Sequence, residues 1–143
     1  MLRLVIDTNI WIRILLGGKI STPVFEALQA DKFIPILSEP LLDELREVSQ
    51  RPRLAKRINQ DDANLLFEIL ELSGEFVILQ TVPHRCRDPK DHPVLATAID
   101  GLAQAILSGD DDLRADDELR QAMAEYGVEL WGINSFLSAI SED

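Results

Sequence analysis

Five short and mostly apolar runs most constrain how this chain can fold, because they have the pattern of strands buried on both faces. They occupy residues 2–6, 33–37, 76–79, 105–107 and 128–131. Helical patterns separate them and begin after Ser38, after Asp61, at Val94 and at Leu119. Strands buried on both faces that alternate with helices are typical of a parallel sheet covered on each side. The sequence therefore predicts an α/β fold with three α/β/α layers around a mostly parallel five-stranded sheet.

Composition narrows the class of protein. The chain has 143 residues, and it contains no repeats and no linker-like stretch, so we expect a single domain over residues 1–143. No segment approaches about 18 uninterrupted apolar residues, and no export signal is visible at the N-terminus. The single cysteine, Cys86, cannot form an internal disulfide. We therefore expect a cytoplasmic protein that does not span a membrane.

The chain is strongly acidic. Its net charge is −11, with 25 acidic and 14 basic residues. A protein that binds nucleic acid only through phosphates is usually basic, so this balance argues against a simple nucleic-acid-binding module. It is compatible with an enzyme that gathers acids around a divalent cation, because the ion changes the local sign of the charge. A surface that is acidic only for solubility would explain part of the excess.

Acidic residues follow two of the predicted strands. Asp7 follows the first strand, and Asp110, Asp111 and Asp112 follow the fourth. Open parallel sheets bind their ligands beyond the carboxyl ends of the strands, which makes both clusters candidates for a site. Each cluster could instead cap the helix that follows it. For either cluster alone, the two interpretations are equally good.

Helical periodicity allows two more acids to join these clusters. Each residue turns an α-helix by about 100°, which places Asp91 near the centre of the buried face that contains Val94. Glu44 falls at the margin of an apolar face, whereas Asp100 projects outward. A carboxylate aimed at a core is costly unless it is paired or binds a metal. Asp91 could alternatively cap its helix, and Glu44 could pair with an arginine.

A shared site would need a cation. If Asp7, Glu44, Asp91, Asp110 and Asp112 meet, their repulsion forces some of them to bind protons at neutral pH. A divalent ion removes that cost. Oxygen ligands favour Mg²⁺ or Mn²⁺, and no set of cysteines and histidines has the spacing of a zinc site.

Four segments carry a resemblance to a known family: VIDTNI, SEPLLDELREV, DPKDHPVLATAIDGLAQAILSGDDDL and VELWGINSFL. In this order they resemble the PIN-domain ribonucleases, especially the VapC-like toxins of toxin–antitoxin pairs. The resemblance implies metal-binding acids at Asp7, Glu44, Asp91 and Asp110, with Asp112 as an accessory acid. It further implies that Asn9 orients Asp7. Ser108 stands where the family commonly has threonine, which preserves the hydroxyl.

The resemblance also has implications for the whole molecule. It implies the strand order 3-2-1-4-5, a homodimer, and the hydrolysis of RNA phosphodiesters by water that Mg²⁺ or Mn²⁺ activates. If an antitoxin partner exists, the family suggests a small protein segment that covers the acidic cleft.

Two groups of basic residues could guide RNA to such a site. The first group is Arg46, Arg51, Arg53, Lys56 and Arg57, and the second is Arg85, Arg87 and Lys90. Either group could instead form a solvated surface with ion pairs.

Two other functions stay open. A PIN-like protein that no longer cleaves RNA would act as a binding partner or scaffold, although the complete set of acids argues against it. A phosphoacceptor receiver domain, which also binds Mg²⁺, would place a lone aspartate after a middle strand and a lysine after the fifth. Here the third strand runs into Gln80 and Thr81, and the fifth into Gly132.

Overall fold

The computed structural model describes residues 1–17, 22–81 and 92–141. In this part of the chain, five parallel strands form one sheet in the order β3-β2-β1-β4-β5. The strands are β1 (Leu2–Ile6), β2 (Phe33–Leu37), β3 (Glu75–Phe76), β4 (Ala105–Leu107) and β5 (Glu129–Trp131). The predicted α/β fold and its strand order are confirmed. Receiver domains have the order 2-1-3-4-5, so that alternative is wrong.

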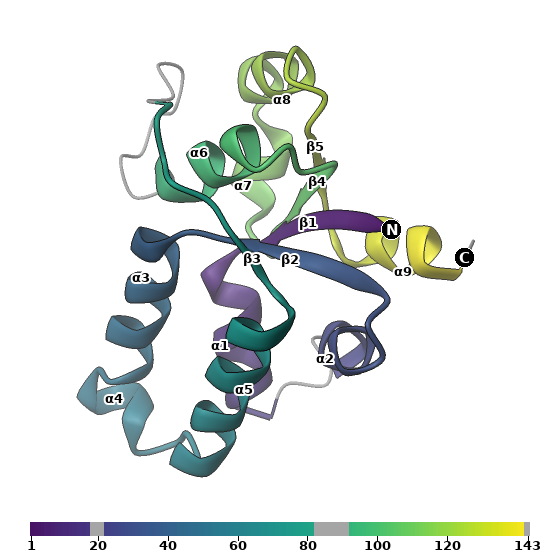
Figure 1. Cartoon of the computed structure of the whole chain (residues 1–143). Helices are drawn as coiled ribbons and strands as arrows, with labels where there is room; N and C mark the ends of the chain where they lie inside the picture. The colour runs from purple at the N-terminus through teal and green to yellow at the C-terminus, as the bar shows by residue number, and fades with distance from the viewer. Residues whose placement is uncertain (18–21, 82–91, 142–143) are drawn as a thin grey trace.

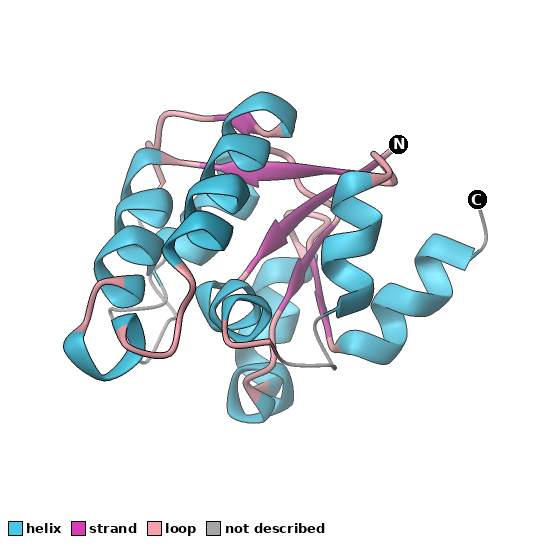
Figure 2. Ribbon diagram, turned by 90° about the horizontal axis from the view of Figure 1, so that it is seen from below, coloured by secondary structure: helices cyan, strands magenta, loops and turns pink. Residues whose placement is uncertain are grey.

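Helices cover both faces of the sheet (Figures 1 and 2). One layer holds α1 (Thr8–Leu15), α2 (Thr22–Gln29), α5 (Gln60–Ser73) and α9 (Ile133–Ser141). The other holds α6 (His92–Asp100), α7 (Asp111–Ala115) and α8 (Asp117–Ala124). Two further helices, α3 (Glu39–Ser49) and α4 (Pro52–Ala55), follow β2, and α3 contributes to both layers. No helix in the described residues combines the length and the apolar character that a bilayer crossing requires.

Apart from Arg3 near the start of β1, the central strands are apolar because they meet a helical layer on each face. Successive side chains of a strand point to opposite sides. In β1, Leu4 and Ile6 pack in the layer of α1 and α5, whereas Val5 packs in the layer of α6. In β4, Leu107 and Ile106 divide between the layers in the same way. Buried apolar surface on both faces thus fixes β1 and β4 at the centre of the sheet.

The helix starts agree only in part with the sequence patterns. Ser38 caps α3 as predicted, since its hydroxyl accepts a hydrogen bond of 3.3 Å from the Leu41 amide. The helix predicted to follow Asp61 begins at Gln60 instead. Its cap is Asn59, whose side chain accepts hydrogen bonds from two amides of the first turn. Asparagine and aspartate are equally good caps, so the pattern could not distinguish the two positions.

The edge strands were predicted less well than the central ones. The prediction that residues 76–79 form a strand buried on both faces is wrong, because β3 ends at Phe76. Phe76 is 48% exposed and Ile78 is 86% exposed. β3 pairs only with the end of β2, and after Val77 the chain leaves the sheet. At the other edge, β5 begins at Glu129, one residue later than predicted.

Asp100, predicted to project outward, instead anchors the chain that follows β3. Its carboxylate accepts hydrogen bonds from the amides of Gln80 (2.7 Å) and Thr81 (3.0 Å), and from the Thr81 hydroxyl (2.6 Å). Partial burial opposes ionisation of Asp100, but these three hydrogen bonds outweigh it and lower the pKa of the carboxyl. The C-terminal end of α6 therefore holds the segment that leaves the sheet at its edge.

Replacing Asp100 by alanine should lower the free energy of unfolding by about 1–3 kcal/mol, because three donors lose a charged acceptor. Urea unfolding at neutral pH measures this loss. The lowered pKa means that the stabilisation exists above the ordinary pKa of aspartate and disappears as the pH falls through the folded-state value. Asp43→Ala, at an exposed position of α3, is the control and should change little. Equal stability of the two variants would contradict the anchoring role.

Candidate active site

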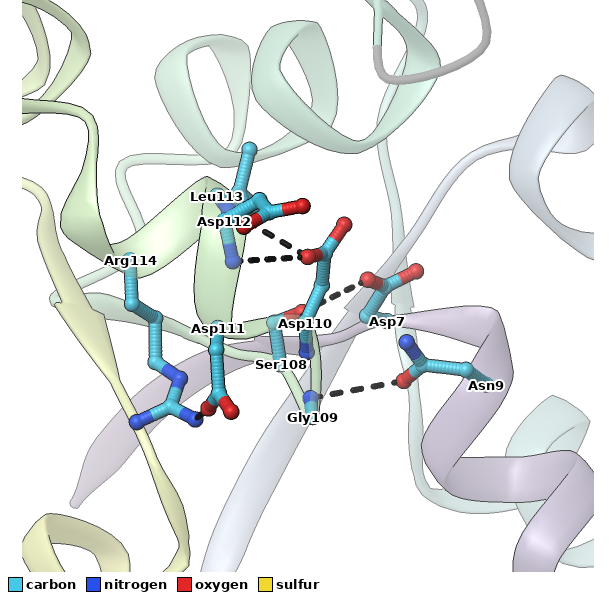
Figure 3. Close-up of polar contacts among 9 residues, drawn as sticks. All are labelled: Asp7, Asn9, Ser108, Gly109, Asp110, Asp111, Asp112, Leu113 and Arg114. Carbon is cyan, nitrogen blue, oxygen red and sulfur yellow. Dashed lines mark hydrogen bonds and ion pairs between the residues drawn. The ribbon is translucent and has the colours of Figure 1, made fainter.

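The neighbouring parallel strands β1 and β4 bring two distant aspartates together. Ile6 pairs with Leu107, and the Asp7 amide continues the pairing with a 2.9 Å hydrogen bond to the Leu107 carbonyl. Because the strands run in the same direction, the residues that follow them emerge at the same edge of the sheet. Asp7 and Asp110 therefore lie beside each other at the carboxyl ends of the two central strands (Figure 3).

Ser108 links the two aspartates. Its side chain is buried, and its hydroxyl donates a hydrogen bond of 2.8 Å to Oδ2 of Asp7. The hydroxyl oxygen of Ser108 also accepts a hydrogen bond of 3.0 Å from the Asp110 amide. One hydroxyl thus fixes a carboxylate that follows β1 and the backbone that follows β4 (Figure 3). A threonine would provide the same hydroxyl.

The two aspartates differ in their relation to the helices that follow them. Asp110 caps α7, since its Oδ1 accepts hydrogen bonds from the amides of Asp112 (2.9 Å) and Leu113 (3.3 Å). Asp7 occupies the capping position of α1 but makes no capping hydrogen bond with its side chain. The capping interpretation therefore holds for Asp110 and fails for Asp7. Both capping hydrogen bonds use Oδ1 of Asp110, so the second carboxylate oxygen takes no part in them.

The environment of Asp7 raises the pKa of its carboxyl. Burial is the largest cause, and the charge of Asp110 adds to it. The Ser108 hydroxyl and the nearby amides of Thr8 and Asn9 favour the ionised form but do not outweigh burial. A carboxylate held in this way gains from a neighbouring positive charge.

The other predicted site residues lie at different distances from this pair. Glu44 is half-buried on α3, and its Oε2 accepts a 3.4 Å hydrogen bond from the Thr8 hydroxyl, next to Asp7. Asp112 lies in the first turn of α7 and is exposed. The side chain of Asn9 accepts a long hydrogen bond of 3.5 Å from the Gly109 amide, and it forms no hydrogen bond with the Asp7 carboxylate. Asp91 lies outside the described residues.

The described side chains suit a hard divalent ion. All donors of the pair are carboxylate oxygens, which Mg²⁺ and Mn²⁺ prefer. Among the described residues there is no group of three or more histidine, cysteine, aspartate or glutamate side chains placed to hold a metal. Mg²⁺ keeps several waters and commonly uses only one or two carboxylates, so the Asp7–Asp110 pair fits its needs.

The predicted basic groups are only partly described. Arg46 forms an ion pair of 2.8 Å with Glu71, and Arg51 forms one of 2.9 Å with Glu47. For these two arginines the ion-pair alternative holds. The remaining members of the first group, Arg53, Lys56 and Arg57, are exposed. Arg85, Arg87 and Lys90 lie outside the described residues.

Sequence reasoning missed one basic residue at this site, Arg13 of α1. A Cβ built on Gly109 would lie 2.7 Å from Nη1 and 3.0 Å from Cζ of Arg13, so the guanidinium rests against this glycine. Its position four residues after Asn9 on α1 was the available signal, because residues so spaced share a helix face.

Comparison with protein families agrees with the fold. The model of the PIN domain matches residues 3–112, well over half of the chain. The chain belongs to the PIN-domain family. No curated protein and no solved structure gave a match. PIN domains are typically metal-dependent nucleases, and the matched region extends from β1 into the first turn of α7.

The raised pKa of Asp7 predicts that Asp7→Asn stabilises the protein when no metal is present. Because the folded-state pKa exceeds the ordinary value, the contribution of Asp7 to stability is full at low pH and is lost as the pH rises through the folded-state pKa. Asparagine keeps an acceptor for Ser108 without the charge. In EDTA at neutral pH, the Tm should rise by about 3 °C. The gain should shrink on acidification, and a Tm that falls at neutral pH would contradict the assignment.

Removing the bridge should be costly. Ser108→Ala leaves the Asp110 amide and an Asp7 oxygen without their shared partner, so the free energy of unfolding should fall by about 1–3 kcal/mol. The pKa of Asp7 should rise further, which a ¹³C NMR titration of the carboxyl would measure. Ser108→Thr should restore the pKa, and Ser135→Ala at an exposed position is the control. An unchanged pKa in Ser108→Ala would show that the bridge does not support Asp7.

Proposed function

We propose that the protein is a metal-dependent ribonuclease that hydrolyses RNA phosphodiesters. The observation that carries this proposal is the Asp7–Ser108–Asp110 link, which holds two acids from distant parts of the chain at one edge of a parallel sheet. If Asp110 only capped α7, it would need no link through Ser108 to Asp7, the residue that follows β1. Membership of the PIN-domain family supports the same chemistry.

Mg²⁺ or Mn²⁺ would be held by Asp7 and Asp110, with Glu44, Asp91 and Asp112 contributing directly or through water. Such an ion lowers the pKa of a bound water and neutralises charge on the leaving oxygen. No nucleophilic side chain is needed.

The chain's own residues prepare this site. Ser108 holds Asp7 by one oxygen and so limits the rotation of its carboxylate. The first-turn amides of α7 hold Asp110 in the same way. Burial keeps the Asp7 carboxylate poorly solvated, which strengthens its interaction with any cation that enters. The site is therefore rigid before a ligand binds.

We also propose a biological setting that follows from the resemblance to VapC-like proteins. The protein would act in the cytoplasm as a homodimer and as the toxin of a toxin–antitoxin pair. A small antitoxin would cover the acids and suppress cleavage. Co-purification of a small protein encoded beside this chain, with loss of ribonuclease activity in the complex, would test this partner.

The test of the activity uses a labelled single-stranded RNA and a DNA of the same sequence. The wild type should cleave the RNA with Mg²⁺ or Mn²⁺ and stop when EDTA is added. Asp7→Asn and Asp110→Asn should each reduce the rate by about 100-fold or more, since even outer partners of a metal site cost 10–100-fold. Asp43→Asn, an exposed acid of α3, is the matched control and should retain activity.

The outcomes separate the remaining alternatives. A folded wild type that cleaves no RNA with any divalent ion would favour the silent scaffold. Cleavage that survives both aspartate substitutions would place the active centre elsewhere or reveal a contaminating nuclease.

A further inference from the structure

Arg13 is distinguished from the other arginines near the sheet edge by its surroundings. It lies in the last turn of α1 and is exposed, and its guanidinium packs on Gly109. Gly109 lies between Ser108, which binds Asp7, and Asp110. The positive charge of Arg13 therefore lies against the loop that holds Asp110 beside Asp7.

Five of the other described arginines have a carboxylate within the ion-pair distance, whereas Arg53 and Arg57, like Arg13, form no ion pair with a described residue. The pairs are Arg3–Glu75, Arg46–Glu71, Arg51–Glu47, Arg114–Asp111 and Arg120–Asp117. Arg13 has no ion pair and no side-chain hydrogen bond to any residue that the structure describes. Arg13 differs from Arg53 and Arg57 because its guanidinium packs against Gly109, the residue next to Asp110. Asp110, whose Oδ1 binds the amides of α7, forms no ion pair with Arg13.

Two side chains of α1 fix this arrangement. Asn9 and Arg13 share a helix face, and both contact Gly109, Asn9 at the amide and Arg13 over the α-carbon. A side chain at position 109 would occupy the place of the guanidinium. The guanidinium therefore packs against the backbone of Gly109, and its donors form no hydrogen bond with a described residue. An oriented guanidinium with free N–H groups matches the two oxygens of a phosphate.

We propose that Arg13 binds a backbone phosphate of the RNA strand next to the one that is cleaved, and so positions the strand over Asp7 and Asp110. This proposal rests on the proposed ribonuclease function. Arg13 is a substrate-binding residue in this scheme and takes no part in proton transfer. A purely structural role, in which its charge interacts with the C-terminal end of α1, would affect stability but not RNA binding.

The experiment compares Arg13→Ala and Arg13→Lys with Arg120→Ala, an exposed arginine of α8 that has a carboxylate partner. Steady-state cleavage of a short RNA gives KM and kcat separately. Arg13→Ala should raise KM about tenfold or more and change kcat less, because a contact to phosphate outside the reacting atoms mainly affects binding. Arg13→Lys should recover part of the loss, since it keeps the charge without the planar fork. Arg120→Ala should match the wild type.

A binding measurement separates this proposal from the function itself. Fluorescence anisotropy of labelled RNA is measured against salt in the Asp7→Asn background, where no cleavage is expected. Arg13→Ala should reduce the slope of log K against log salt by about 0.7–1, the value for one phosphate contact.

If the wild type cleaves RNA but Arg13→Ala leaves KM and this slope unchanged, the proposed role of Arg13 is wrong and the proposed ribonuclease function stands. If nothing cleaves but the slope still falls, the ribonuclease is wrong and Arg13 remains a phosphate contact. Absence of both cleavage and binding overturns both proposals.

Discussion

The parallel pairing of β1 with β4 is the constraint on which the candidate active site depends. Both strands are buried by helices on their two faces, so their register is fixed by packing. Ile6 lies opposite Leu107, and the next residues on each strand leave the sheet together. A shift of the register would place the Ser108 hydroxyl beside a different residue than Asp7 and break the bridge. The core and the site are therefore specified by the same pairing.

The site is obtained at a cost to stability. Asp7 is a partly buried carboxylate beside a second one, and its pKa is raised because the hydrogen bonds it receives do not compensate for burial and for Asp110. A protein selected for stability alone would replace one of these acids by a neutral residue. The large apolar core offsets this cost, so the protein can keep both carboxylates side by side. Such a pair gains most from the ion that the family uses.

The sequence predicted what depends on local pattern and on strand ends. β1, β2 and β4 have the bounds that their apolar runs predict, because buried central strands must be apolar on both faces. Asp7 and Asp110 could be placed together once parallel order was assumed. The edge strand β3 was mispredicted because an apolar run at an edge need not be buried, as Ile78 shows.

Contacts between distant segments lay beyond such patterns. The hydrogen bond between Asn9 and Gly109 joins residues 100 positions apart, and the packing of Arg13 on the same glycine depends on how α1 crosses the loop after β4. Asp100 was read as outward-facing because helical periodicity describes the helix alone. It could not show that Gln80 and Thr81 would return to the end of α6. Sequence reasoning therefore brought Asp7 and Asp110 to one edge of the sheet, but it did not predict the contacts of Gly109 with Asn9 and Arg13 or the anchoring role of Asp100.

Net charge is a poor guide to whether this protein can bind a polyanion. At physiological ionic strength, salt screens exposed charges beyond about 8 Å, so most of the 25 acids are hidden from a bound phosphate. The charges that matter are those near the carboxyl ends of β1 and β4. They are the carboxylates of Asp7, Asp110, Glu44 and Asp112, the guanidinium of Arg13, and any divalent ion that the carboxylates hold. A bound divalent ion adds two positive charges to this local sum and so weakens its repulsion of a phosphate. Overall acidity would then slow the approach of RNA, while the short-range contacts at the sheet edge would still bind it.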